Sequence, residues 1–354
     1  MNYALIMAGG SGTRFWPASR KALPKQFLKL WSKETLIEET CSRIRKLVPK
    51  NRLEVFTQAS KAGWVAKHLK IASSQVVGEP MGRNTAPCAI WAALRLLKKD
   101  PDAVIAILPS DHFIGKPKQF EKALKAAYAV AQKTGQPVTL GIQPDSPHTG
   151  YGYLELQSKK TTQDSFSVYQ LKQFHEKPDA KKAASFLKSG KFLWNAGIFV
   201  WRADELVKCA EKYLPKSVEI LRKIVNEKIS GKKLTELFSR VESISIDYGL
   251  MEHLKGKILS IPVSVDWNDV GNWSTLAKLL KQDRDGNVFQ GNVVAVRSRS
   301  NFVRTQGKPV ALVGVKDMVI VDAGDVFLVC PKSETESIRD LVHELDKRNM
   351  KGCL

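Results

Sequence analysis

A glycine-rich segment with several cations lies almost at the start of the chain and offers the first candidate chemistry. Residues 7–27 read MAGGSGTRFWPASRKALPKQF, with glycine at positions 9, 10 and 12. Glycine permits unusual backbone torsions and lets backbone N–H groups approach an anion closely. Arg14 and Lys25 add positive charge. The segment therefore predicts a phosphate-binding loop with enough charge for a triphosphate.

Two common phosphate-binding motifs do not fit this segment. A P-loop would end in Gly-Lys-Ser or Gly-Lys-Thr, and neither follows the glycines. The dinucleotide-binding pattern GxGxxG fits Gly10 and Gly12 but meets Phe15 at its third position. A plain strand-to-helix turn is an alternative for GGSG alone, and the adjoining Thr-Arg and PKQF residues count against it.

Strands and helices alternate along the first part of the chain. Apolar runs predict strands at 3–8, 53–58, 103–114 and 137–142, and helical spacing predicts helices at 35–48, 85–99 and 120–135. This alternation predicts an α/β fold with a doubly wound, mostly parallel sheet of the Rossmann-like kind. Ligands of such sheets bind at the carboxyl ends of the strands, where the glycine loop and the turn PSDH (109–112) both fall.

The composition changes after about residue 283. Residues 286–331 contain short valine-rich strands separated by glycine, asparagine and aspartate turns, which predicts an all-β module. A final helix is expected over 333–349, with Ser333 and Glu336 as a capping box. We therefore expect a catalytic domain at 1–283 and a C-terminal module at 284–354.

Composition limits the class of protein. The chain has 354 residues, of which 43% are apolar and 26% charged, as in ordinary globular proteins, and its formal net charge of +21 favours anionic ligands. Its five cysteines form no CxxC pair, which predicts reduced thiols in the cytoplasm. No apolar run reaches about 18 residues, so neither a signal peptide nor a membrane span is expected.

The glycine loop followed by PKQF resembles the signature of the sugar-nucleotide pyrophosphorylases, and within them the GDP-mannose pyrophosphorylases. Further segments resemble blocks of this family in the same order: EPMGRNTAP (79–87), PSDH (109–112), TGYGYL (149–154), FHEKP (174–178), WNAGIF (194–199), SIDYGLME (245–252) and WNDVGNW (267–273). The resemblance covers nearly all of residues 1–280. EPMGRNTAP is the most specific block, because relatives that use other nucleotides carry different residues there.

The resemblance implies a nucleotidyltransferase. The expected reaction is in-line attack of a mannose 1-phosphate oxygen on the α-phosphorus of GTP, which gives GDP-mannose and pyrophosphate. Such a reaction needs positioning and neutralisation of developing charge more than covalent catalysis. The implied cofactor is Mg²⁺, a hard cation that takes oxygen ligands.

The resemblance also implies the site residues. The catalytic group comprises Arg14, Lys25, Asp111 and Asp269, and the two aspartates are the metal ligands. The nucleotide-binding group comprises Gly9, Gly10, Ser11, Gly12, Thr13, Glu79, Gly82, Asn84 and Thr85. The sugar-phosphate group comprises Gly152, Glu176, Lys177 and Asn195.

Several acidic residues and one histidine have competing interpretations. Asp111 alone could be an N-cap or turn residue, and Asp266 lies three residues before Asp269. His112 invites a general-base role, but a structural role is favoured because a phosphate nucleophile is already ionised at neutral pH. Asp247 and Glu252 are weak candidates for the sugar or metal site.

The recognition segments also have plainer interpretations. Glu79 is expected to accept hydrogen bonds from guanine, and the alternative is a solvated glutamate before a proline. The segment EKP could be an exposed turn. Asn195 is harder to explain in this way, because an asparagine inside an apolar strand must find hydrogen-bond partners.

The expected partners are GTP, mannose 1-phosphate and a second copy of the chain. The C-terminal module resembles a short left-handed β-helix, which implies a homodimer and a role in assembly rather than chemistry. One alternative is a related hexose-1-phosphate nucleotidylyltransferase with another nucleotide or sugar. A nucleic-acid-binding protein is disfavoured because the cations are dispersed, and a non-enzymatic relative is disfavoured because all four catalytic residues are present.

Overall fold

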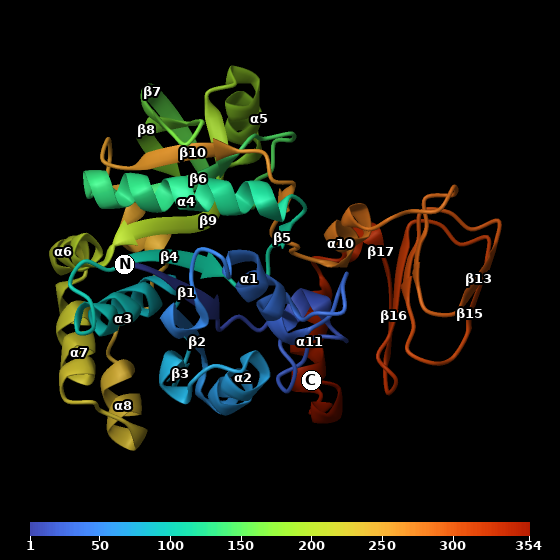
Figure 1. Cartoon of the computed structure of the whole chain (residues 1–354). Helices are drawn as coiled ribbons and strands as arrows, with labels where there is room; N and C mark the ends of the chain where they lie inside the picture. Colours follow the sequence, from blue (N-terminus) through green and yellow to red (C-terminus); the bar gives the residue numbers. More distant parts are fainter. The chain divides into compact units, whose positions relative to one another are not determined.

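The computed structural model describes all 354 residues, which form two compact units (Figure 1). Unit 1 comprises residues 1–9 and 40–267, and unit 2 comprises residues 10–39 and 268–354. This division differs from the expected ranges 1–283 and 284–354, because residues 10–39 group with the C-terminal part of the chain. The glycine loop therefore belongs mainly to unit 2.

A nine-stranded sheet forms the centre of unit 1, in the order β3-β2-β1-β4-β9-β6-β10-β8-β7. The strands are β1 (Asn2–Ala8), β2 (Leu53–Gln58), β3 (Val76–Glu79), β4 (Val104–Pro109), β6 (Val138–Ile142), β7 (Tyr153–Gln163), β8 (Phe166–His175), β9 (Phe192–Arg202) and β10 (Leu259–Val263). β1 to β4 are parallel, as expected. The α/β fold is confirmed, but β9 runs antiparallel to β4, β6 and β7, so the sheet is mixed.

A tight turn accounts for one antiparallel pair of this sheet, β7 with β8. β7 and β8 are joined by Asp164 and Ser165, which have φ values of 47° and 72°. Positive φ at both central residues is the geometry of a two-residue hairpin, which forces neighbouring strands to run in opposite directions.

Unit 1 also contains helices, which are α2 (Ala62–Leu69), α3 (Thr85–Leu97), α4 (Pro117–Thr134), α5 (Ala180–Ser189), α6 (Ala203–Tyr213), α7 (Pro215–Asn226), α8 (Gly231–Phe238) and α9 (Ile246–Gly249). Some of them cover its sheet, and some, such as α7 and α8, pack on other helices. α1 (Leu36–Ile44) contains the change from unit 2 to unit 1. α4 lies along the sheet in Figure 1, and it ends at Gly135, whose φ of 70° suits a glycine stop. No helix in the 354 residues is both long and apolar enough to span a bilayer.

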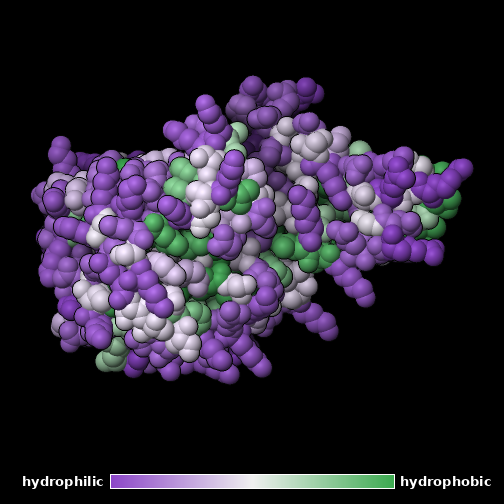
Figure 2. All heavy atoms as spheres, turned by 90° about the horizontal axis from the view of Figure 1, so that it is seen from above, coloured by the Kyte–Doolittle hydropathy of each residue, from purple (hydrophilic) through white to green (hydrophobic).

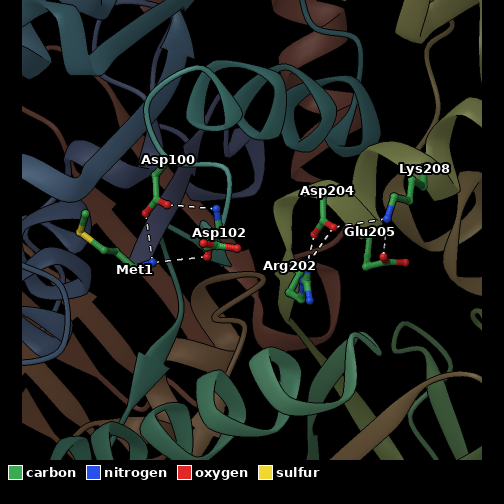
Figure 3. A network of polar contacts seen from close by, with 7 residues as sticks. All are labelled: Met1, Asp100, Asp102, Arg202, Asp204, Glu205 and Lys208. Carbon is green, nitrogen blue, oxygen red and sulfur yellow. Dashed lines mark hydrogen bonds and ion pairs between the residues drawn. The ribbon is translucent and has the colours of Figure 1, made fainter.

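Charged residues fix the starts of β1 and α6 (Figure 3). The Met1 amino group lies 3.0 Å from the Asp100 carboxylate and donates to the Asp102 carbonyl oxygen at 3.3 Å. Arg202 donates two hydrogen bonds to Asp204, at 3.0 and 2.8 Å. Asp204 lies in the first turn of α6, where a negative charge is favourable.

Parallel strands in successive coils build the C-terminal part of unit 2. They are β12 (Val288–Gln290), β13 (Val293–Val296), β14 (Phe302–Arg304), β15 (Val310–Val313) and β16 (Met318–Asp322), followed by the antiparallel β17 (Phe327–Pro331). β12, β14 and β16 form one parallel sheet, and β13 and β15 form another. Buried Asn287 and Asn301 stack at one corner, where their side chains hydrogen-bond at 3.1 Å. This arrangement agrees with the expected β-helix-like module.

The remaining elements correct one expectation. They are the two-residue strands β5 (Phe113–Ile114) and β11 (Trp267–Asn268), and the helices α10 (Trp273–Leu279) and α11 (Ile338–Lys347). The capping box of Ser333 and Glu336 is wrong, because Lys332–Glu334 forms a separate 3-10 turn and the final helix begins only at Ile338. The Glu336 carboxylate instead contacts other segments of unit 2, as described below.

The core of unit 2 joins its N-terminal and C-terminal segments. Phe15, Trp273 and Phe302 are fully buried, with ring centroids 4.8 Å apart between Phe15 and Trp273 and 5.4 Å apart between Trp273 and Phe302. Trp273 Nε1 also donates to the Trp16 carbonyl oxygen at 3.0 Å. The segment after the glycine loop is therefore packed against both α10 and the β-helix-like module.

Replacement of Trp273 tests this shared core. Trp273→Ala should lower the free energy of unfolding by about 3–5 kcal/mol, because it leaves a large cavity between Phe15 and Phe302. Trp64→Ala is the control: Trp64 is 43% exposed on α2, so its removal should cost less than about 1 kcal/mol. Urea unfolding followed by circular dichroism gives both values. Equal losses in the two variants would contradict the core assignment.

Candidate active site

The glycine loop leaves room for the side chain of Lys25. Gly12 has a φ of 63°, and a Cβ atom there would lie only 2.2 Å from the Cβ of Lys25. Any side chain at position 12 would therefore displace Lys25. Ser19 Oγ donates to the Gly12 carbonyl oxygen at 2.6 Å and holds the loop in place. Gly12 is needed for space as well as for its torsion angle.

Lys25 joins the glycine loop to the segment around Asp269. The side chain is only 5% exposed, and its Nζ donates to the backbone carbonyl oxygen of Asp269 at 3.0 Å. The same ammonium group lies 5.3 Å from the centroid of the Phe15 ring, within the range of a cation–π contact. Two of the expected catalytic residues are thus in direct contact within unit 2.

Arg14 approaches the same segment from the loop. Its Nη1 donates to the Gly271 carbonyl oxygen at 3.2 Å. A Cβ atom on Gly271 would lie 3.1 Å from Arg14 Nη1 and 3.4 Å from Asp269 Oδ2. The guanidinium group and the Asp269 carboxylate therefore both border Gly271. Arg14, Lys25 and Asp269 form one cationic and acidic group, which we call the phosphate-side group.

Asp111 follows β4 in unit 1, whereas Asp269 belongs to unit 2. No cluster of three or more histidine, cysteine, aspartate or glutamate residues that could hold a metal ion occurs in the 354 residues. The competing aspartate, Asp266, accepts a hydrogen bond from Lys116 Nζ at 2.9 Å. Mg²⁺ commonly binds through one or two carboxylates together with substrate oxygens and therefore needs no such cluster.

The histidine next to Asp111 is oriented by a tryptophan. Trp267 Nε1 donates to His112 Nδ1 at 3.1 Å. Indole N–H is only a donor, so Nδ1 must be the unprotonated nitrogen, and the neutral imidazole carries its proton on Nε2. In this tautomer Nδ1 is already occupied as an acceptor. The geometry agrees with the structural role favoured for His112.

Glu79 ends β3 with a buried carboxyl group. The residue is only 9% exposed, its Oε1 has no hydrogen-bond partner, and its Oε2 lies 3.4 Å from the position of a Cβ atom on Gly9. Burial raises the pKa of Glu79 to about 7. The alternative of a solvated glutamate is wrong. The group is instead a buried acceptor beside the start of the glycine loop.

The rest of EPMGRNTAP leads into α3. Asn84 has a φ of 65°, and its side-chain oxygen accepts from the Thr85 backbone N–H at 2.9 Å. Thr85 Oγ1 accepts from the Ile246 N–H at 2.8 Å, which joins this segment to SIDYGLME. A Cβ atom on Gly82 would meet nothing within 4 Å. The hydrogen bonds of this segment thus lie at Asn84 and Thr85, while Gly82 faces open space.

The four expected sugar-phosphate residues lie together in unit 1. The Asn195 N–H donates to the Gly152 carbonyl oxygen at 2.8 Å, and a Cβ atom on Gly152 would lie 2.6 Å from Glu176 Oε2. Lys177 Nζ forms an ion pair with Glu176 Oε1 at 2.9 Å. The carboxylate of Glu176 is largely buried, so the exposed-turn interpretation of EKP holds for Lys177 only.

Asp247 joins the sugar-side residues and was only a weak candidate in the sequence. Asn195 Nδ2 donates to Asp247 Oδ1 at 3.0 Å. Burial, with a smaller contribution from the Glu176 charge, raises the pKa of Asp247 to about 6. In the structure Asp247 lies in the first turn of α9, which explains its charge without a ligand. Only the hydrogen bond with Asn195, 52 residues away, shows that Asp247 belongs with the sugar-side residues.

Family models match nearly the whole chain. A nucleotidyl transferase model matches residues 3–286, and a model described as a MannoseP isomerase/GMP-like beta-helix domain matches residues 291–345. The first match covers the glycine loop and every expected site residue.

Individual relatives agree with these models. A mannose-1-phosphate guanylyltransferase of Escherichia coli is 33% identical over 98% of this chain and 74% of its own length. The alginate biosynthesis protein AlgA of Pseudomonas putida is 33% identical over 98% of this chain and 72% of its own length. A crystal structure from Thermus thermophilus, described as a mannose-1-phosphate geranyltransferase, is 31% identical with a TM-score of 0.87, over 98% of this chain and 99% of that one.

Replacement of Gly12 tests the packing of the glycine loop on Lys25. Gly12→Ala should destabilise the protein by about 2–4 kcal/mol, the sum of left-handed backbone strain and overlap with Lys25. Gly190→Ala separates the two effects, since Gly190 has a φ of 66° but nothing within 4 Å of its Cβ position. That control should cost only about 1–2 kcal/mol. Chemical denaturation provides the measurement, and indistinguishable losses would refute the overlap.

Proposed function

Because the chain belongs to the nucleotidyl transferase family, we propose that it transfers GMP from GTP to α-D-mannose 1-phosphate, giving GDP-mannose and pyrophosphate. The proposal assigns the base to the surroundings of Glu79, the sugar phosphate to the residues around Asn195, and the reacting phosphates to the phosphate-side group. The name of the E. coli relative, a mannose-1-phosphate guanylyltransferase, supports this activity.

The unpartnered Oε1 of Glu79 is the observation that carries the choice of guanine. A buried acceptor without a donor is costly, so a ligand that supplies donors is favoured there. Guanine presents two donors along one edge, the N1–H and the 2-amino group. A carboxylate has two acceptor oxygens and takes both donors in parallel.

Other transferred groups suit Glu79 less well. Uracil presents acceptors beside its single donor, and these would face a carboxylate. The relative from Thermus is named for a geranyl group, which is apolar and has no donor at all. Either group would leave the buried carboxyl group of Glu79 unsatisfied. We therefore keep guanosine triphosphate as the proposed donor substrate.

The sugar-side residues supply partners for a hexose phosphate. Glu176 and Asp247 are acceptors for adjacent sugar hydroxyls, and the amide of Asn195 orients the second of these carboxylates. Lys177 is more than half exposed and provides a positive charge for the sugar phosphate. This combination of acceptors and one cation fits a neutral hexose with a phosphate at one end.

The proposed reaction is an in-line displacement at phosphorus. An ionised oxygen of mannose 1-phosphate forms a bond to the α-phosphorus of GTP, and the bond from the α-phosphorus to the bridging oxygen breaks. Pyrophosphate leaves with that electron pair, so no general base is required. Arg14 and Lys25 neutralise charge on the phosphoryl oxygens and on the leaving group, which is the main requirement of this chemistry.

Asp111 and Asp269 are the proposed Mg²⁺ ligands. Both are carboxylates, and a hard cation shared between two carboxylates and substrate oxygens matches the usual coordination of Mg²⁺. When bound, the ion adds positive charge to the phosphates. Lys25 contributes from the protein side by holding the backbone of Asp269 in place.

The proposal includes a homodimer formed through the C-terminal module. Val294, Val296 and Val313 are more than half exposed on β13 and β15. Figure 2 shows some hydrophobic atoms at the surface of this module, among largely hydrophilic ones. A second copy of the chain would cover these valines.

The five free cysteines support the expectation of a reducing cytoplasmic environment.

A substrate panel tests the proposed function. The protein is incubated with Mg²⁺, each nucleoside triphosphate and each common hexose 1-phosphate, and pyrophosphate release is measured. GTP with mannose 1-phosphate should give the highest kcat/KM. Preference for another pair would replace the proposal by a related hexose-1-phosphate nucleotidylyltransferase.

The pKa of Glu79 predicts how nucleotide affinity depends on pH. Only the ionised carboxylate accepts both guanine donors, and in the free protein it ionises at a pKa of about 7. Affinity for guanosine, which has no sugar phosphate to reach Asp247, should be constant above about pH 8 and fall about tenfold per unit below about pH 6, because protonation of Glu79 competes with binding. Calorimetric titration measures it. Glu79→Gln should bind more weakly without this pH dependence, and a flat wild-type profile from pH 5 to 8 would contradict the assignment.

Inosine triphosphate tests the contact between Glu79 and guanine by a change in the base. It lacks only the 2-amino group, so its kcat/KM should be about 10- to 200-fold lower than that of GTP, the scale of one lost hydrogen bond to a charged group. Glu79→Gln supplies an amide donor and should narrow the difference between GTP and UTP. Equal use of GTP and inosine triphosphate by the wild type would remove Glu79 from the base site.

Substitution of the two aspartates tests the shared metal. Asp111→Asn and Asp269→Asn should each abolish Mg²⁺-dependent turnover, and the double variant should be little worse than either, because members of one unit are not additive. Asp266→Asn is the matched control and should leave turnover close to normal, since Asp266 pairs with Lys116 instead. Two effects that simply multiply would show that the aspartates act independently.

A further inference from the structure

Glu336 of the C-terminal segment contacts the arginine of the glycine loop. Its Oε2 lies 3.1 Å from Arg14 Nε, and the two residues are separated by more than three hundred positions in the chain. The side chain of Arg14 is 26% exposed, and that of Glu336 is 60% exposed. The contact therefore joins a proposed catalytic residue to the module that the sequence assigns to assembly.

The other oxygen of Glu336 reaches the segment that carries Asp269. Asn272 Nδ2 donates to Glu336 Oε1 at 2.7 Å. Asn272 is also the N-cap of α10, where its Oδ1 accepts from the Thr275 N–H at 2.8 Å. One carboxylate therefore bridges Arg14 and the start of α10. Its position in the chain gave no sign of this, because the same residue fits a helix capping box.

An ion pair and one hydrogen bond hold the guanidinium group of Arg14, and because Nε itself forms no hydrogen bond, the contact with Glu336 is electrostatic. Glu336 faces Nε, and the Gly271 carbonyl oxygen accepts from Nη1. Neither contact involves Nη2. An arginine side chain has many rotamers, so contacts that select one of them before the substrate arrives reduce the entropy lost on binding.

We propose that Glu336 is a positioning residue that orients Arg14 toward the reacting phosphates, so that the C-terminal module takes part in catalysis. This inference rests on the proposed function. Other ion pairs of unit 2 also join residues 10–39 to the C-terminal segment, such as Arg20 with Asp325 and Lys21 with Asp346. Glu336 differs from them because one of its oxygens contacts Arg14 of the phosphate-side group and the other accepts from Asn272, three residues after Asp269.

Glu336→Gln with a matched control tests this role. The variant should lower kcat about three- to tenfold, with the KM for GTP within about twofold of normal, because orientation matters most in the transition state. Glu344→Gln is the control: it removes one carboxylate from an exposed pair with Arg348 in the same segment. It should leave kcat and the unfolding midpoint unchanged. A shorter carboxylate in Glu336→Asp should restore part of the loss.

A double-mutant cycle with Arg14 distinguishes positioning from a general structural effect. If Glu336 acts through Arg14, Glu336→Gln should change kcat less than about 1.5-fold in the Arg14→Lys background. Single-turnover measurements at high enzyme concentration supply the same cycle where steady-state turnover is too slow to measure. Equal effects in both backgrounds, or an unchanged kcat in the single variant, would overturn the inference.

The two proposals fail in different ways. Absence of pyrophosphate release by the wild type in the substrate panel would remove the proposed function. An active wild type with no coupling between Glu336 and Arg14 would remove only the positioning role.

Discussion

The contact between Phe15, Trp273 and Phe302 is the constraint on which the phosphate-binding side of the molecule depends. These three rings come from the glycine-loop segment, α10 and the β-helix-like module, and they are all fully buried. Arg14 directly precedes the first ring, and Gly271 lies two residues before the second. Packing of the rings therefore fixes the distance between the loop and the segment that carries Asp269. The ion pairs and hydrogen bonds orient the charged side chains, while burial of the rings contributes most of the free energy that holds these segments together.

Glycines create the space in which the charged groups meet. Gly12 leaves room for Lys25, Gly152 leaves room for Glu176, and Gly271 lies between Arg14 and Asp269. At each position a Cβ atom would come within about 3 Å of the functional side chain. A phosphate loop is usually explained by torsion angles and backbone donors alone. Here the absence of side-chain volume is an equal requirement.

Local patterns in the sequence predicted the first strands and helices well. β2 has the expected bounds, β1 begins one residue earlier, and α4 ends at the expected glycine, because hydrophobic spacing and glycine stops are local signals. The sugar-side residues also lie together as the family resemblance implied. The reversed direction of β9, the pairing of Asp247 with Asn195, and the contact of Glu336 with Arg14 were not foreseen. Each depends on residues far apart in the chain, which no local pattern encodes.

The division of the chain between the two units has a consequence for protein synthesis. Residues 10–39 leave the ribosome early, but Gly271, which accepts a hydrogen bond from Arg14, is translated 257 residues later. At about 5–20 residues per second this delay is about 10–50 s. During that interval the nascent glycine loop lacks its native neighbours, while residues of unit 1 are already emerging. A polypeptide released prematurely would carry the base and sugar residues without a formed phosphate side. The phosphate side of the molecule can therefore assemble only after the C-terminal segment has been synthesised.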